Sequence, residues 1–462
     1  MLYRTLRASA LIALRWYYSE VIVQGHERVP RDGPTLIVAN HPNALVDAML
    51  VTTSVRRQVL ITAKATLFEH PLLAPFLTAV GVVPLRRAKD ERGRANDDPA
   101  ASRNVDAFRR VTDTLRGGRA VLVFPEGISH DEARLAPLKS GAARMAIQAR
   151  VAGARGLQIL PVGLVYEAKE SPRSRVLVRI GTPVDLDEAF LADPQLNALA
   201  ITREINSRLR QVTFNFASPA RAEQAIRLTR ALTAITNDPM SLGDTSSFAA
   251  EAQVAVRVTA ATEALEGAPR HLSAAADDLS ARVEQLEARL TERGLFLADV
   301  KISLGLGHAL RFVVREAAIV AIALPIALVG NVAHFVPLRF ARAVAMRSVA
   351  NDPSRDQPAM RTMVLGVAAV LLWYALLALL VSRWVGGWAA VLVLLPVYLA
   401  AQVDLLLRDR LTKALRRARA YRVFRNDPAL RTEVLRELEG LLTEAVSLEK
   451  ALTHGTRQAN EV

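Results

Sequence analysis

The sequence contains no cysteine among its 462 residues. This absence excludes disulfides, thiolate metal ligands and a cysteine nucleophile, and it fits a reducing compartment such as the cytoplasm. The sequence also lacks a Gly-x-Ser-x-Gly elbow, which would indicate a serine acyl-enzyme, and any helix-turn-helix, zinc-finger or RNP-type signature. It shows neither a metal-ligand cluster nor a nucleotide-binding glycine loop, so we expect no metal, no bound cofactor and no nucleic-acid partner.

Length and charge indicate several units and a lipid surface. A chain of this length predicts two or three units with a sizeable core. The formal net charge is +14, and most of it lies between Lys301 and Arg425, where 17 lysines and arginines accompany 5 acidic residues. The same stretch is very apolar, and basic residues that flank apolar segments favour an anionic lipid surface.

Residues 1–20 predict an amphipathic N-terminal helix. Their apolar stretch before Arg15 is too short and too charged for a signal peptide or a membrane span. Such a helix either lies on a membrane surface or packs on the domain that follows it.

Residues 21–216 predict an α/β domain, because short β-branched runs alternate with helix-compatible segments. The predicted strands are 21–23, 35–39, 58–62, 80–85, 120–124, 158–165 and 176–180, and the predicted helices include 44–54, 101–116 and 140–151.

Residues 217–300 predict helices, and residues 426–462 predict a polar helical tail. Leu272, Leu279 and Leu286 recur every seven residues, as in a coiled-coil seam. Because three heptads are few, we expect 217–300 to form a helical hairpin or linker docked on the α/β domain; a dimerisation rod is the alternative.

The basic region 301–425 predicts a membrane anchor with apolar segments at 317–338, 363–381 and 384–401, each near the ~20 residues that cross a bilayer. The positive-inside rule places the arginine-rich loop 339–361 on the same face as the α/β domain, which we expect to be cytoplasmic. A hairpin over 363–401 satisfies this rule. One full span at 317–338 violates it, so we expect a broken or re-entrant pair of half-helices there; three spans that violate the rule are the alternative.

Two short stretches that follow apolar β-like runs carry the candidate chemistry. Asn40 to Asp47 follows the run 35–39, and Phe124 to His130 follows the run 120–123. His41 can act as a general base if a carboxylate holds its imidazole in one tautomer, and Asp47 is the nearest candidate. The spacing of six requires a turn, which Pro42-Asn43 supplies. A structural histidine satisfied by a carboxylate is the alternative.

Four ordered blocks resemble the glycerophospholipid acyltransferases, which include glycerol-3-phosphate and bacterial 1-acylglycerol-3-phosphate acyltransferases. The blocks are Asn40-His41 through Asp47, Gly81 to Arg87, Phe124-Pro125-Glu126-Gly127 and Leu160-Pro161-Val162-Gly163, and Leu138 to Ala142 looks like the family's Lys-Gly helix start. The resemblance covers roughly residues 20–215. It implies an acyltransferase domain with a mixed sheet flanked by helices, followed here by a helical region and C-terminal membrane helices.

The resemblance also implies a reaction. His41 would deprotonate a hydroxyl of glycerol 3-phosphate or lysophosphatidate, with Asp47 orienting the imidazole. The hydroxyl would attack acyl-CoA or acyl-acyl carrier protein directly, without an acyl-enzyme, at a membrane phospholipid surface. The implied substrate-binding residues are Lys64 and Arg87 for the phosphate, Glu126, Gly127 and Lys139 for the acceptor pocket, and Pro161 for the acyl-donor side.

Departures from the family pattern concern the acceptor. Five residues instead of the commoner four separate His41 from Asp47, which looks like the branch with yeast-type glycerol-3-phosphate acyltransferases and favours glycerol 3-phosphate. Ile128-Ser129-His130 stands where Thr-Arg-Ser is usual, and Pro84 stands where an aromatic residue is usual. Two other functions are kept open, a catalytically inactive lipid-binding scaffold and an acyl-thioester hydrolase that uses water as the acceptor.

Overall fold

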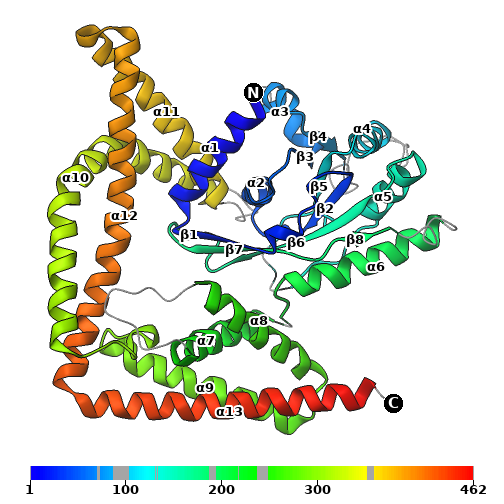
Figure 1. Ribbon diagram of the computed structural model, residues 1–462. Coiled ribbons are helices and arrows are strands. Elements are labelled where there is room, and N and C mark those ends of the chain that lie inside the picture. Colours follow the sequence, from blue (N-terminus) through cyan, green and yellow to red (C-terminus); the bar gives the residue numbers. More distant parts are fainter. Residues whose placement is uncertain are drawn as a thin grey trace. The chain divides into compact units, whose positions relative to one another are not determined.

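The chain divides into two compact units. The computed structural model describes residues 2–69, 73–86, 104–130, 132, 134–186, 194–216, 218–236, 248–350 and 358–460. One unit comprises Met1–Phe214 with Ala343–Leu365, and the other comprises Asn215–Arg342 with Gly366–Val462. Figure 1 shows the sheet of the first unit and the long helices of the second.

The first unit is built on one sheet. Within the described residues the sheet runs in the order β1-β7-β6-β2-β5-β3-β4, with β8 beside β6. The strands are β1 (Glu20–Gln24), β2 (Thr35–Ala39), β3 (Val59–Lys64), β4 (Val83–Leu85), β5 (Ala120–Val123), β6 (Gln158–Tyr166), β7 (Arg175–Ile180) and β8 (Val184–Asp185). Pairs β2–β5, β2–β6, β3–β5 and β3–β4 are parallel, whereas β6 is antiparallel to β7 and β8. The expected mixed sheet flanked by helices is confirmed.

Helices cover both faces of this sheet because its strands bury side chains alternately on either side. Ile37 and Ala39 of β2 join the cluster under α1 (Leu2–Tyr17) and α2 (Ala44–Ser54). Leu36 and Val38 join the cluster under α4 (Val105–Arg116), α5 (Gly141–Val151) and α6 (Pro194–Val212). A short helix, α3 (Leu73–Val80), leads to β4.

The N-terminal helix α1 packs on the α/β domain. Leu14 and Tyr17 are each 2% exposed in the first cluster, and Arg7 donates hydrogen bonds to the carbonyl oxygens of Thr52 (3.2 Å) and Thr53 (2.7 Å) at the end of α2. Ile12 remains exposed on the other side of α1. Contact of that side with a membrane stays a prediction.

The second unit contains a helical bundle. In its described part, residues 217–300 hold three helices, α7 (Pro219–Thr236), α8 (Phe248–Ala264) and α9 (Arg270–Glu292), where a hairpin is predicted. Residues 265–269 separate α8 from α9. The last of them, Pro269, lacks the N–H that would continue a helix. The heptad residues Leu279 and Leu286 of α9 are buried with Leu438 of α13 (Pro428–Asn460), so this seam packs inside the bundle.

The apolar segments form three long helices, α10 (Leu306–Ala350), α11 (Pro358–Val385) and α12 (Gly387–Asn426). Two described helices, Leu306–Arg347 and Arg361–Trp384, are long and apolar enough to cross a membrane. The predicted apolar segment 384–401 covers the end of α11 and the first part of α12. Its insertion into a membrane stays a prediction.

The predicted break within 317–338 is wrong, because α10 is continuous through Pro325 and Pro337. Each proline removes one backbone donor, a defect that a long helix absorbs by bending. Two further residues of this segment, Gly330 and His334, pack against neighbouring helices. A Cβ on Gly330 would lie 2.2 Å from the Ala400 carbonyl oxygen, so glycine lets α10 and α12 approach closely. His334 hydrogen-bonds to Gly330 O (2.9 Å) and to the Tyr374 hydroxyl of α11 (2.7 Å).

Candidate active site

The candidate site lies at the carboxyl ends of parallel strands. His41 follows β2, Phe124 follows the neighbouring β5, and Lys64 ends β3 on the other side of β5. Because these strands are parallel, their carboxyl ends meet at one edge of the sheet. Ligands of open α/β sheets commonly bind at this edge.

His41 and Asp47 form a hydrogen-bonded pair. His41 Nδ1 lies 2.9 Å from Asp47 Oδ2. The turn between them is closed by the same oxygen, which accepts the backbone N–H of Asn43 (2.7 Å). An ionised carboxylate only accepts hydrogen bonds, so in the neutral imidazole this contact places the proton on Nδ1 and the lone pair on Nε2. The predicted contact across a turn is therefore present, and it holds His41 in the tautomer that a general base requires.

Asp47 has no exposed side-chain surface. Its second oxygen, Oδ1, accepts a hydrogen bond of 2.5 Å from the Tyr166 hydroxyl at the end of β6. Burial and the nearby Asp47 charge raise the pKa of Tyr166, so its hydroxyl stays protonated and remains a donor. The Tyr18 ring packs on the Tyr166 ring. Burial raises the pKa of Tyr18 as well, so its hydroxyl stays neutral.

Phe124 and Glu126 fix the rest of His41. The Phe124 ring stacks on the imidazole with 3.9 Å between ring centroids and 13° between planes. The His41 backbone N–H donates to Glu126 Oε1 (2.8 Å). His41 is thus held at its ring and at its backbone by two side chains that follow β5, the strand beside its own.

The Glu126 carboxylate is buried and fully engaged within the domain. Its Oε2 accepts the Ala136 backbone N–H (2.8 Å) and contacts His130 Nε2. The hydrogen bond to Glu126 raises the pKa of His130, and burial opposes this shift. Glu126 therefore braces the loop after β5 against His41, and its predicted place in the acceptor pocket stays a prediction.

Gly127 and Lys139 lie together next to Glu126. Gly127 has φ +71°, and a Cβ there would lie 2.8 Å from Lys139 Nζ. The Lys139 backbone N–H donates to Pro125 O (2.9 Å) just before α5. The structure thus places an ammonium group at the glycine of the third block.

The predicted phosphate cations are only partly placed. Lys64 is the last residue of β3 and pairs with Leu85 of β4. Arg87 lies outside the described residues. Its neighbour Arg86 is anchored through its backbone to Asn104, with N–H to Oδ1 at 2.9 Å. Within the described ranges, no group of three or more His, Cys, Asp or Glu side chains could hold a metal ion.

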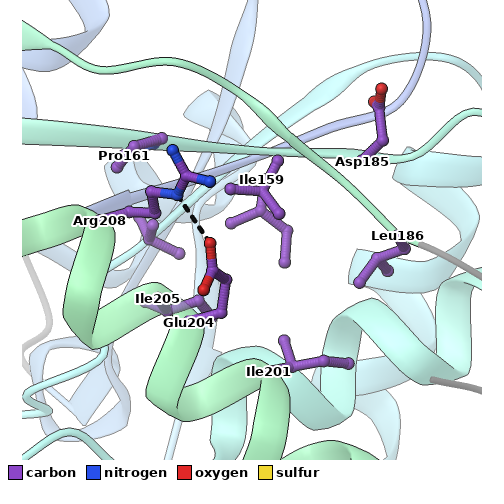
Figure 2. A pocket seen from close by; sticks show the side chains of 10 residues that line it. Ile159, Pro161, Asp185, Leu186, Ile201, Glu204, Ile205 and Arg208 are labelled. Carbon is purple, nitrogen blue, oxygen red and sulfur yellow. Dashed lines mark hydrogen bonds and ion pairs between the residues drawn. The ribbon is translucent and has the colours of Figure 1, made fainter. Parts of the chain in front are cut away.

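Pro161 lies apart from His41. Phe124 and Tyr166 pack against the cluster under α1 and α2, whereas Pro161 of β6 lines a small apolar pocket under α6. Figure 2 shows this pocket, with the Glu204–Arg208 ion pair (2.7 Å) of α6 at its wall. The structure therefore does not bring Pro161 together with the His41–Asp47 pair.

Sequence reasoning missed Tyr166 and Lys169 at this site. Tyr166 lies only three residues after the fourth block, but its contact depends on the register that sets Ala39 of β2 beside Val162 of β6. Lys169 Nζ donates to the Pro42 carbonyl oxygen (3.1 Å), and no local spacing signals that contact.

Comparison with known proteins agrees with this geometry. Residues 20–165 match the family model described as Acyltransferase. An uncharacterized acyltransferase of Schizosaccharomyces pombe is 26% identical over 261 residues, which are 39% of this chain and 38% of that protein. A chloroplastic 1-acyl-sn-glycerol-3-phosphate acyltransferase of Brassica napus is 29% identical over 151 residues, 32% of this chain and 38% of that one.

Glycerol-3-phosphate O-acyltransferase 2 of Saccharomyces cerevisiae is 33% identical over 117 residues, 24% of this chain and 16% of its own. The chain thus spans well under half the length of these relatives. Among solved structures, the 1-acyl-sn-glycerophosphate acyltransferase PlsC of Thermotoga maritima is 22% identical with a TM-score of 0.32, covering 44% of this chain and 78% of its own. The similarity to acyltransferases thus lies mainly in the segment 20–165, which matches the Acyltransferase family model.

Proposed function

We propose that this protein is a membrane-bound O-acyltransferase of phospholipid synthesis. It moves an acyl group from acyl-CoA, or from acyl-acyl carrier protein, to a hydroxyl of glycerol 3-phosphate or lysophosphatidate. The observation that carries the proposal is the hydrogen bond between His41 Nδ1 and the buried Asp47 carboxylate, at the strand edge of an acyltransferase-family domain.

His41 is the base of the first step. Its Nε2 takes the proton of the acceptor hydroxyl while the hydroxyl oxygen forms a bond to the thioester carbonyl carbon. The imidazolium that forms carries a positive charge, which the Asp47 carboxylate 2.9 Å away stabilises. Tyr166 keeps that carboxylate from rotating, because it occupies the oxygen that His41 does not use.

The second step breaks the carbon–sulfur bond. The tetrahedral intermediate collapses, the thiolate leaves, and the proton on His41 Nε2 passes to the sulfur. The products are an ester and a free thiol, and His41 returns to its neutral form. Acyl transfer thus needs no covalent enzyme intermediate. Exclusion of water at a membrane face favours the acceptor hydroxyl over hydrolysis of the thioester.

Cations at the strand edge support a phosphate-bearing acceptor. Lys64 ends β3 at this edge, Lys139 lies at Gly127, and Arg87 follows β4 in the sequence. Paired cations are suited to a phosphate dianion. The relatives in Brassica napus and Saccharomyces cerevisiae are named for 1-acyl-sn-glycerol 3-phosphate and glycerol 3-phosphate, and the five-residue spacing between His41 and Asp47 favours glycerol 3-phosphate here.

The apolar helices α10 and α11 support attachment to a membrane, since both meet the length and hydropathy that a bilayer requires. The arginines that flank them support a cytoplasmic location for the acyltransferase domain.

The test is acyl transfer from radiolabelled palmitoyl-CoA in membranes that carry the full chain, with glycerol 3-phosphate and lysophosphatidate offered in parallel. The variant is His41→Ala, and the matched control is His26→Ala, which removes a histidine that is 60% exposed. We expect label in one acceptor, its loss with His41→Ala and its retention with His26→Ala.

Three results would contradict the proposal. Release of free CoA without any acceptor indicates a thioesterase, and lipid binding without turnover indicates an inactive scaffold. Turnover that survives His41→Ala removes the assigned base.

A further inference from the structure

The start of α10 belongs to one core, and the segment that holds its end and the start of α11 belongs to the unit of the other core. Near its start, Phe312 is 8% exposed and clusters with Leu279 and Phe424 of the helical bundle. Beyond its apolar part, residues 343–365 belong to the first unit, where Met363 is 2% exposed in the cluster that holds Leu14 of α1. Any membrane topology therefore has to keep the α/β domain and the helical bundle, which surround these two cores, outside the hydrocarbon of the bilayer.

Exposed charge pairs show that the bundle is a water-facing structure. Arg282 of α9 pairs with Glu444 of α13 at 2.7 Å, and Arg289 pairs with Glu433 at 3.2 Å. These side chains are between 36% and 62% exposed. Such charges are expensive to transfer into hydrocarbon.

Where the chain first passes from the first unit to the second, between α6 and α7, it has no segment that could cross a bilayer. In the first unit α6 ends at Val212, and in the second α7 begins at Pro219. A crossing needs ~20 residues in a helix, and the interval between these helices is far shorter. The α/β domain and the bundle therefore occupy the same aqueous compartment.

We infer that α10 does not cross the membrane: its apolar middle lies in one leaflet, and both of its ends return to the compartment of the α/β domain. The inference rests on the membrane attachment proposed above. The same connectivity applies to the hairpin of α11 and α12, whose two ends are fixed by Met363 and Phe424, so the hairpin enters and leaves by one face.

The surface of α10 fits lipid acyl chains. Large apolar side chains recur along it at helical spacing and are strongly exposed: Ile322 at 72%, Val329 at 58%, Val332 at 73%, Val336 at 60% and Phe340 at 66%. The side of α10 that carries Gly330 and His334 packs on α12 and α11 instead. Figure 1 shows α10 and α12 running side by side.

The arginines agree with this arrangement. Arg311 and Arg315 precede the apolar middle of α10, and Arg339, Arg342 and Arg347 follow it. A crossing helix would put these two groups on opposite faces, contrary to the positive-inside rule. A helix that stays in one leaflet leaves both groups on the same anionic lipid surface.

Single cysteines can test the topology, because the natural chain has none. Gly307→Cys probes the start of α10, where an added Cβ meets open space, and Met346→Cys probes its end, where the side chain is 48% exposed. Val332→Cys probes the apolar middle, and Val151→Cys, at a 72% exposed position, marks the α/β domain. The full chain is labelled with a membrane-impermeant maleimide in sealed vesicles of each orientation.

We expect Gly307→Cys, Met346→Cys and Val151→Cys to react in the same vesicle orientation. Val332→Cys should lose its reactivity in membranes and gain it when detergent is added. Reaction of Gly307→Cys and Met346→Cys in opposite orientations would overturn the inference, as would aqueous labelling of Val332→Cys in intact vesicles.

The attachment on which the inference rests is tested separately. Release of the protein by alkaline carbonate would overturn the proposed attachment itself, without reference to the side on which any cysteine reacts.

Discussion

Tyr166 donates a hydrogen bond of 2.5 Å to Oδ1 of Asp47, the carboxylate oxygen that the His41 ring does not contact. Asp47 is thereby held at both oxygens in a site without exposed carboxylate surface. Its charge is shielded from solvent, so the imidazolium of His41 in the proposed mechanism would be the cation best placed to interact with it.

Replacing Tyr166 by Phe should lower kcat about 10- to 100-fold and leave KM nearly unchanged, because loss of one hydrogen bond to a charged group is worth about 1.5–3 kcal/mol. The effect falls on kcat because the Asp47 charge matters most when His41 is protonated. Steady-state kinetics of Tyr166→Phe measure it, with Tyr421→Phe of α12 as the control for loss of a hydroxyl. A raised KM with unchanged kcat would instead assign Tyr166 to substrate binding.

His130 predicts a pH dependence of stability. The hydrogen bond to Glu126 raises its pKa above the ordinary 6.5, with the Glu132 charge adding and burial and Lys169 opposing. The folded state therefore binds this proton more tightly than the unfolded state. The resulting stability is fully present below about pH 6.5 and is lost as the pH rises through the raised pKa.

Thermal unfolding over a pH series measures this linkage. The Tm difference between the natural protein and His130→Gln should be largest in mildly acidic buffer and should shrink as the pH rises. The exposed His26→Gln serves as the control. A Tm difference for His130→Gln that is constant across the series would contradict the assigned proton.

Gly127 is required by its backbone. With φ at +71°, Gly127→Ala should reduce the free energy of unfolding by about 1–2 kcal/mol. The nearest obstacle to the new Cβ is the flexible end of Lys139, so strain in φ dominates and the loss should persist in a Lys139→Ala background. Chemical denaturation measures both, with Gly141→Ala, which meets open space, as the control. Full rescue by Lys139→Ala would show that the contact is the cause.

The sequence allows the domain and the first half of the site to be predicted, since each depends on local patterns. Alternating β-branched runs predict the strands, and a turn-forming Pro42-Asn43 predicts that His41 can reach Asp47. Tyr166 could not be found in this way, because it meets Asp47 only through the pairing of β6 with β2. The continuity of α10 was missed for a similar reason. In the sequence, Gly330 suggests that the helix is interrupted. Its actual role, close packing against Ala400, depends on a residue 70 positions away in the sequence.

Asp299 should be the most sensitive charged residue of the second unit. Its side chain has no exposed surface and forms an ion pair with Arg416 at 2.9 Å, beside the buried Arg417. Burial raises the pKa of Asp299, and the two guanidinium groups oppose that shift. Asp299→Ala would remove the buried carboxylate that pairs with Arg416 and faces the charge of Arg417, at a cost of about 3 kcal/mol in the free energy of unfolding.

The matched comparison is Glu437→Ala, which removes one of the two acidic partners of the half-exposed Arg289 and should cost at most about 1 kcal/mol. Chemical denaturation of the full chain, followed by circular dichroism, measures both variants. Equal losses would mean that Asp299 is solvated in solution. A larger loss for Asp299→Ala would show that this ion pair fixes the segment before α10 onto α12, and hence fixes the point from which α10 leaves the bundle.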